Sequence, residues 1–159
     1  MPPPWKEALR LRLKEPAAVV GIGNSASGDD AAGPEVVRLL AGRTRAALFD
    51  CGCVPENFIG PIARAKPTCI VLVDAAPAGG APGAVSVHPL SDLREATFHT
   101  HAASPSLFLD VLVERTRAEC FMIGIEPHRA GFGEHMSDEV IATAREVSDE
   151  IARLLPIAR

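Results

Sequence analysis

The stretch that decides the fold is AAVVGIGNSASGDDAAGPEVVRLL, residues 17–40. Its first part, AAVVGIG (17–23), is a short apolar run that ends in glycines, which is typical of a buried parallel strand. Residues 31–42 then carry apolar side chains at the spacing of one helical face. A strand, a glycine-rich turn and a helix in this order predict the first unit of an α/β fold.

The same alternation continues to the end of the chain. Further strands are expected over 46–52, 69–75, 83–89 and 119–127, and helices over 55–65 and 104–118 and from a Ser137 cap onward. The loop before 83–89 is too short for a helical crossover, so this strand is expected to be an antiparallel edge. We predict one three-layer α/β/α domain over 17–159, with a mostly parallel sheet of about five strands, preceded by an appended helix within 1–16.

Composition excludes several classes of function. The chain has 159 residues, of which 47% are apolar, and its 16 basic and 20 acidic side chains give a net charge of -4. A nucleic-acid surface would need a basic patch, so no nucleic-acid partner is expected. No apolar run approaches the roughly 18 residues of a membrane span, and the first residues lack the apolar core of a signal peptide. We therefore expect a cytoplasmic protein with no membrane association.

Polar side chains gather where the predicted strands end. Asp29 and Asp30 follow the first strand, Asp74 ends the strand over 69–75, and His99 and His101 precede the helix over 104–118. If the first and third strands are neighbours, these groups converge at the carboxyl edge of the sheet, where α/β folds place their sites. Two carboxylates and an imidazole suit a borderline divalent ion such as nickel or zinc.

Each of these residues also has a structural interpretation. Asp30 could be only a helix N-cap, and Asp74 could simply accept hydrogen bonds from loop amides. A single loop histidine is more often on the surface than a metal ligand. Cys51 and Cys53 have no activating base beside them in the sequence, so we expect a structural or incidental role for both.

A dinucleotide site is the competing interpretation of the glycine-rich turn. Residues 21–26, GIGNSA, fit G-x-G-x-x-G/A after a strand, and Asp50 ends the second strand as a ribose-binding acid would. Asp29 and Asp30, however, would place two negative charges where a pyrophosphate has to bind. The chain also lacks a G-x-S-x-G elbow, an H-E-x-x-H pair and a P-loop lysine.

Five stretches in order resemble the hydrogenase maturation endopeptidases. The first, GIGNSASGDDAAGPEV (21–36), is similar to the opening motif of that family. The others are DCGCVPENFI (50–59), VLVDA (71–75), THAASPSLFLDVL (100–112) and IGIEP (123–127). The second of them is closest to the branch that serves formate-hydrogenlyase-type hydrogenases. Ala26, Ala31, Cys51 and Cys53 depart from residues usual in these motifs, but no expected ligand is missing.

The resemblance implies a metal site formed by Asp30, Asp74 and His101, with His99 as the neighbouring histidine that is not a ligand. It implies that the metal is nickel already seated in the partner, a [NiFe]-hydrogenase large-subunit precursor, whose C-terminal extension is then removed. The free enzyme is expected to hold metal weakly, because three ligands leave nickel unsaturated.

The catalytic residues expected on this basis are Asp29, Asp30 and Asp74, which would make the enzyme a peptidase of the aspartic type. Asp29 is expected to orient the attacking water or to act as the base. No side-chain nucleophile is expected, because the motifs supply no serine or cysteine with an evident activating base.

Overall fold

The computed structural model describes residues 1–93 and 105–158, and within the latter range the side chains from residue 107 onward. The strands are β1 (Ala17–Gly21), β2 (Ala47–Asp50), β3 (Cys69–Ala75), β4 (Val85–Pro89) and β5 (Glu119–Ile125). The helices are α1 (Pro4–Arg12), α2 (Ala32–Leu40), α3 (Ile59–Arg64), α4 (Leu90–Leu93), α5 (Pro105–Thr116) and α6 (Asp138–Leu154), with 3-10 turns η1 (Gly28–Ala31) and η2 (Pro55–Phe58). Among the described residues, no helix is both long and apolar enough to cross a membrane.

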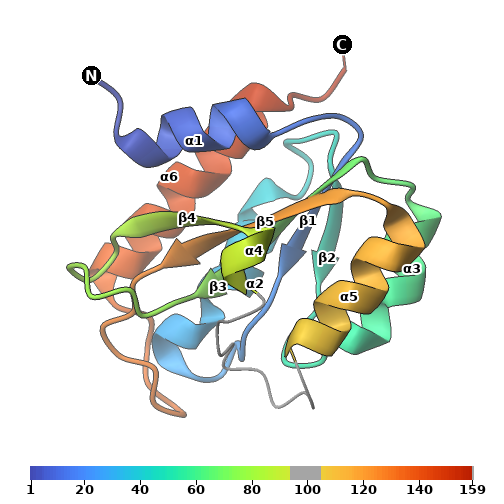
Figure 1. The fold of residues 1–159 in the computed structure, drawn as a ribbon. Helices are drawn as coiled ribbons and strands as arrows, with labels where there is room; N and C mark the ends of the chain where they lie inside the picture. Colours follow the sequence, from blue (N-terminus) through green and yellow to red (C-terminus); the bar gives the residue numbers. More distant parts are fainter. Residues whose placement is uncertain (94–104, 159) are drawn as a thin grey trace.

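The strands form one sheet in the order β2-β1-β3-β5-β4 (Figure 1). β1, β2, β3 and β5 run parallel, and β4 pairs antiparallel with β5 at the edge. The predicted fold class is therefore confirmed, including the neighbouring positions of the first and third strands and the antiparallel edge. The short helix α4 was not expected, because its four residues are too few to show a helical period.

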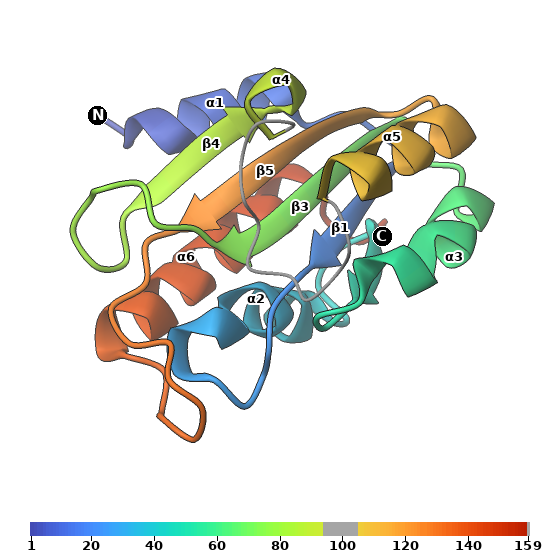
Figure 2. The ribbon, with the colours of Figure 1, turned by 60° about the horizontal axis from the view of Figure 1, so that its bottom comes forward.

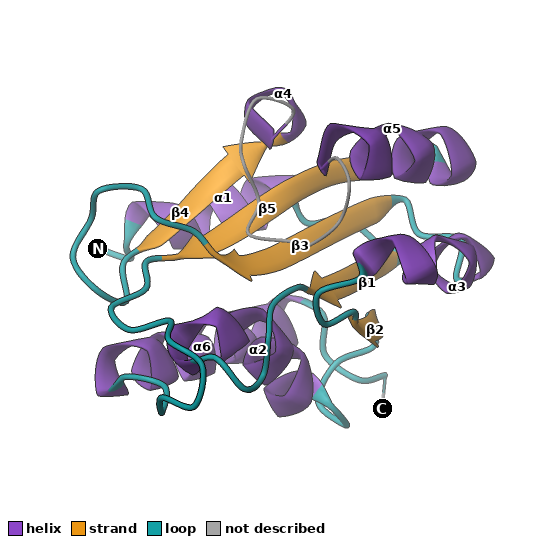
Figure 3. Cartoon of the chain, turned by 90° about the horizontal axis from the view of Figure 1, so that it is seen from below, coloured by secondary structure: helices purple, strands orange, loops and turns teal. Residues whose placement is uncertain are grey.

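Helices cover both faces of the sheet, as Figure 3 shows. One buried cluster joins the sheet to α1, α2 and α6, and the other joins it to α3, α4 and α5. The strands β1 and β3 are buried along their whole length, which explains why they read as unbroken apolar runs. Leu9 of α1 is fully buried in the first cluster, so the appended helix packs on the same core.

Gly33 sets the distance between α2 and the sheet. A side chain at this position would collide with the backbone carbonyl oxygens of Ile22 and Val73, so only glycine allows this approach. Because α2 begins directly against the carboxyl ends of β1 and β3, the turn η1 that precedes it lies at that edge. Figure 2 shows the segment that follows β1 descending to α2 at this edge of the sheet.

Candidate active site at the carboxyl edge of the sheet

Asp74 lies near the end of the central strand β3 and is almost completely buried, with 2% of its surface exposed. Among the described residues, its Oδ1 atom has no hydrogen-bond partner. Burial raises the pKa of this carboxyl to about 8, the charge of Asp30 adds to the increase, and the backbone N–H of Ala75 opposes it. Buried polar atoms are nearly always satisfied, so this oxygen requires a partner that the described residues do not supply.

Asp30 is the second acid at this edge and is carried by η1, which packs against β3. Its Oδ2 atom accepts a hydrogen bond of 2.9 Å from the backbone N–H of Asn24. It makes no side-chain cap at the start of α2, so the simple N-cap interpretation does not hold. Its charge contributes to the raised pKa of Asp74, so the two expected ligands lie near enough at this edge for their charges to interact.

The third expected ligand, His101, lies outside the described residues, as does His99. Within residues 1–93 and 105–158, no group of three or more histidine, cysteine, aspartate or glutamate side chains is arranged to hold a metal ion. The described part of the chain therefore offers two carboxylates, and a further donor has to come from elsewhere in the chain or from a substrate.

Asp29 differs from Asp30 in its burial and in its hydrogen bonds. It is fully buried, and its carboxylate accepts hydrogen bonds from the backbone N–H groups of His128, Arg129 and Ser137, each at 2.7 Å, and from the Ser137 hydroxyl. Burial opposes ionisation, but these hydrogen bonds outweigh it and lower the pKa of Asp29. Because both oxygens are occupied and hidden from solvent, the geometry argues against the expected role of Asp29 as a base and favours a structural one.

The glycine-rich turn is not open for a phosphate. Gly23 has a φ of +141°, and a side chain there would collide with the carbonyl oxygen of Asp30. The backbone N–H of Asn24 is donated to the Asp30 carboxylate, and that of Ala26 to the Asn24 side chain. The amides that a dinucleotide site would offer to its pyrophosphate are thus already used within the turn, which disfavours the dinucleotide hypothesis.

Comparison with known proteins shows the family of this chain. A family model described as hydrogenase maturation protease matches residues 34–154. This chain belongs to the hydrogenase maturation proteases.

Individual relatives show the same likeness along most of the chain. This chain is 34% identical over 117 residues to the hydrogenase 3 maturation protease of Escherichia coli strain K12, and the match covers 70% of this chain and 72% of that protein. The crystal structure of the [NiFe] hydrogenase maturation protease HycI from Thermococcus kodakarensis KOD1 matches with a TM-score of 0.82 and 28% identity, over 93% of this chain and 98% of that one. The solution structure of the endopeptidase HycI from Escherichia coli matches with a TM-score of 0.76 and 28% identity, over 86% and 89%.

In this maturation protease the two cysteines that follow β2 have different surroundings. Cys51 is 1% exposed, belongs to the core, and has a pKa raised to about 12 by burial and then by the charge of Asp50. Cys53 is half-buried, and its pKa is raised by burial and then by the charges of Asp30 and Asp74. Cys53 therefore lies near Asp30 and Asp74, which we call the acid pair. The residues next to Cys53 in the sequence do not predict this position.

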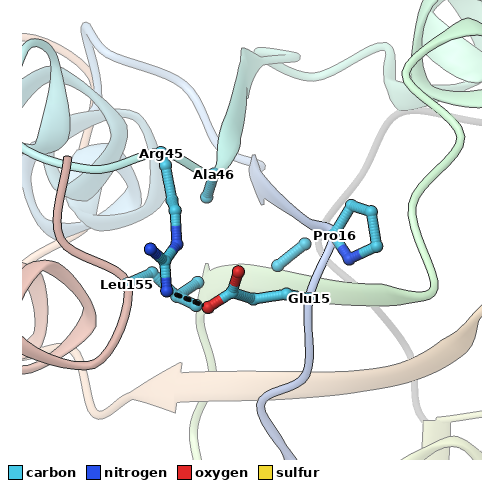
Figure 4. A pocket seen from close by; sticks show the side chains of 6 residues that line it. Glu15, Pro16, Arg45, Ala46 and Leu155 are labelled. Atoms are coloured by element: carbon cyan, nitrogen blue, oxygen red, sulfur yellow. Dashed lines mark hydrogen bonds and ion pairs between the residues drawn. The ribbon is translucent and has the colours of Figure 1, made fainter. Parts of the chain in front are cut away.

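A separate cavity of about 290 Å³ lies at the opposite, amino-terminal edge of the sheet. Figure 4 shows an ion pair between Arg45 and Glu15 in its wall. Its other lining residues are Pro16, Ala17, Ala46 and Leu155. None of the residues in the five motif stretches lines this cavity, so we assign no chemistry to it.

Proposed function

We propose that this protease removes a C-terminal extension from a [NiFe]-hydrogenase large-subunit precursor after nickel has been inserted, and that the nickel in the precursor is what the enzyme recognises. Hydrogenase maturation proteases act on large-subunit precursors. The observation that carries the nickel part of the proposal is the buried carboxyl group of Asp74, which lies near Asp30 and whose Oδ1 has no partner among the described residues.

The donor set fits a metal that arrives with the substrate. Two carboxylates are too few ligands to hold a borderline divalent ion tightly, and the family resemblance adds only one imidazole, His101. Nickel seated in the precursor would bring its own ligands, and Asp30 and Asp74 would complete its coordination. A nickel ion held in this way would supply Lewis acidity next to the scissile bond. The recognition step then reports whether nickel insertion is complete.

The residues of this chain support cleavage by water rather than by a covalent intermediate. Burial holds the Cys51 thiol protonated near neutral pH, since its pKa is about 12. The Cys53 pKa is raised as well, which works against a thiolate nucleophile beside the acids. Asp30 and Asp74 are the carboxylates at the site, so an aspartic-type assignment rests on these two and not on Asp29. We propose a cytoplasmic location for the reaction.

Incubation with two forms of one precursor tests the proposal. The purified protease is mixed with nickel-loaded and nickel-free large-subunit precursor from the same source, and the products are analysed by intact mass. We expect loss of one defined C-terminal fragment from the nickel-loaded form alone. Cleavage of both forms would remove nickel as the recognition element, whereas cleavage of neither would contradict the proposed function itself.

A further inference from the structure

The β5–α6 loop, residues 126–137, combines a fixed backbone with outward-facing side chains. Every residue from 128 to 135 is exposed. The loop runs beside the segment 24–30, which follows β1 and carries Asp30, as Figure 2 shows. A loop that is held by its own side chains usually buries several of them. The side chains of residues 128–135 are exposed, so other contacts must hold this loop in place.

These contacts come from the segment 24–30, which carries Asp30. Three backbone hydrogen bonds join the two segments: the N–H of Gly133 donates to the carbonyl of Ala26 at 2.8 Å, that of Gly28 to Glu134 at 3.2 Å, and that of Asp29 to Arg129 at 2.5 Å. The buried Asp29 carboxylate also accepts from both ends of the loop, at His128 and at Ser137. The loop therefore keeps one position relative to the active site.

Phe132 stands at the tip of this fixed loop. It is 84% exposed, the most exposed aromatic side chain among the described residues. Gly131 and Gly133 flank it, so no neighbouring side chain covers the ring. An exposed phenylalanine contributes nothing to the core, and a polar residue would serve a surface turn better. Aromatic side chains on a preorganised backbone are, in contrast, typical anchors of protein interfaces, because little conformational entropy is lost on binding.

We propose that the β5–α6 loop is a docking arm for the folded precursor, with Phe132 as the side chain that inserts into an apolar depression on its surface. The proposal rests on the proposed function, because the partner that brings its metal and tail to Asp30 and Asp74 must lie against the segment to which this loop is bonded. A folded protein is favoured over a bare peptide tail, since the tail itself has to reach the buried Asp74.

Steady-state cleavage of nickel-loaded precursor by the full-length protein tests the docking arm. Phe132→Ala is expected to raise KM by about tenfold or more and to leave kcat within about twofold, because only binding is lost. Phe132→Leu should recover part of the affinity through its apolar side chain. The matched control is Leu11→Ala on α1, where a leucine 65% exposed lies in the helix at the amino-terminal end of the chain. The control is expected to match wild type.

The possible outcomes separate the two proposals. If wild-type protein cleaves the precursor and Phe132→Ala has an unchanged KM, the docking arm is refuted while the proposed function stands. A fall in kcat without a change in KM would also refute it, because the residue would then act in the chemistry. If wild-type protein is a dimer in solution and Phe132→Ala is a monomer by light scattering, the occupant is a second copy of the chain. If wild-type protein cleaves no precursor, both proposals fail.

Discussion

The hydroxyl of Ser137 donates to the carboxylate of Asp29 at 2.8 Å, although Ser137 occupies the N-cap position of α6. No side-chain cap bond is made to the helix. The two residues lie 108 positions apart in the chain, so this contact ties the start of the last helix to the first motif. Ser137 therefore serves Asp29 rather than its own helix.

Substitution of Asp29 should destabilise the protein without removing its chemistry. Asp29→Asn is expected to lower the free energy of unfolding by about 2 kcal/mol or more, and Ser137→Ala by about 1 kcal/mol, because hydrogen bonds to a buried charge are lost. At low temperature, where Asp29→Asn is folded, its kcat should stay within about tenfold of wild type. Urea unfolding and single-turnover cleavage measure the two effects. Folded Asp29→Asn that cannot cleave would restore the catalytic role expected from the sequence.

Single substitutions test the ligands of the proposed metal site. Asp30→Ala, Asp74→Ala and His101→Ala should each abolish precursor processing while the protein stays folded by circular dichroism. Asp74→Ala removes a buried carboxyl whose Oδ1 has no partner among the described residues, so the fold does not depend on that oxygen. His99→Ala is the matched control and should process normally. If His99→Ala is inactive and His101→Ala is active, the histidine assignment is shifted by two residues.

Asp74 should make the metal-free protein less stable as the pH rises. Its pKa is 3.8 ordinarily and about 8 when folded, so between these values the folded protein holds a proton that the unfolded chain has released. The contribution of Asp74 to stability is therefore most favourable below the lower pKa, falls through this interval and levels off above about 8. Asp74→Asn should remove the fall and gain about 1–3 kcal/mol at pH about 8. Urea midpoints across this pH range measure it.

A control for this titration is Asp92→Asn, which changes an exposed carboxylate on α4. The control should follow the wild-type pH profile. A stability difference between wild type and Asp74→Asn that does not change with pH would show that the Asp74 carboxyl is already ionised in the metal-free protein.

Neither cysteine after β2 should be required for cleavage. Cys51→Ala is expected to cost about 1 kcal/mol through the small cavity it leaves in the core, and Cys53→Ala to cost little. Both variants and the double variant should process the precursor, and iodoacetamide should not inhibit wild-type protein. Intact mass after early quenching should show no acyl-enzyme. A trapped adduct on either thiol would replace water attack with a covalent mechanism.

Much of the fold could be predicted because the buried parallel strands are unbroken apolar runs with glycines or acids at their ends. Asp74 could be predicted as well, since it directly follows such a run. The hydrogen-bond partners of Asp29 could not, because His128 and Ser137 are far away in the sequence and any residue except proline would supply the same three backbone donors. The position of Cys53 could not be predicted for a similar reason, because its neighbours at the sheet edge, Asp30 and Asp74, are distant from it in the sequence.

The way the β5–α6 loop is fastened has an evolutionary consequence. Backbone groups and the carboxylate of Asp29 hold it, so apart from Gly133, whose φ of +80° favours glycine, its outward-facing residues 128–135 carry little folding constraint. Most of these positions can therefore change at little cost to the fold. A single ancestral scaffold would then acquire new client proteins by substitution within one short surface segment, without any renewed selection for stability.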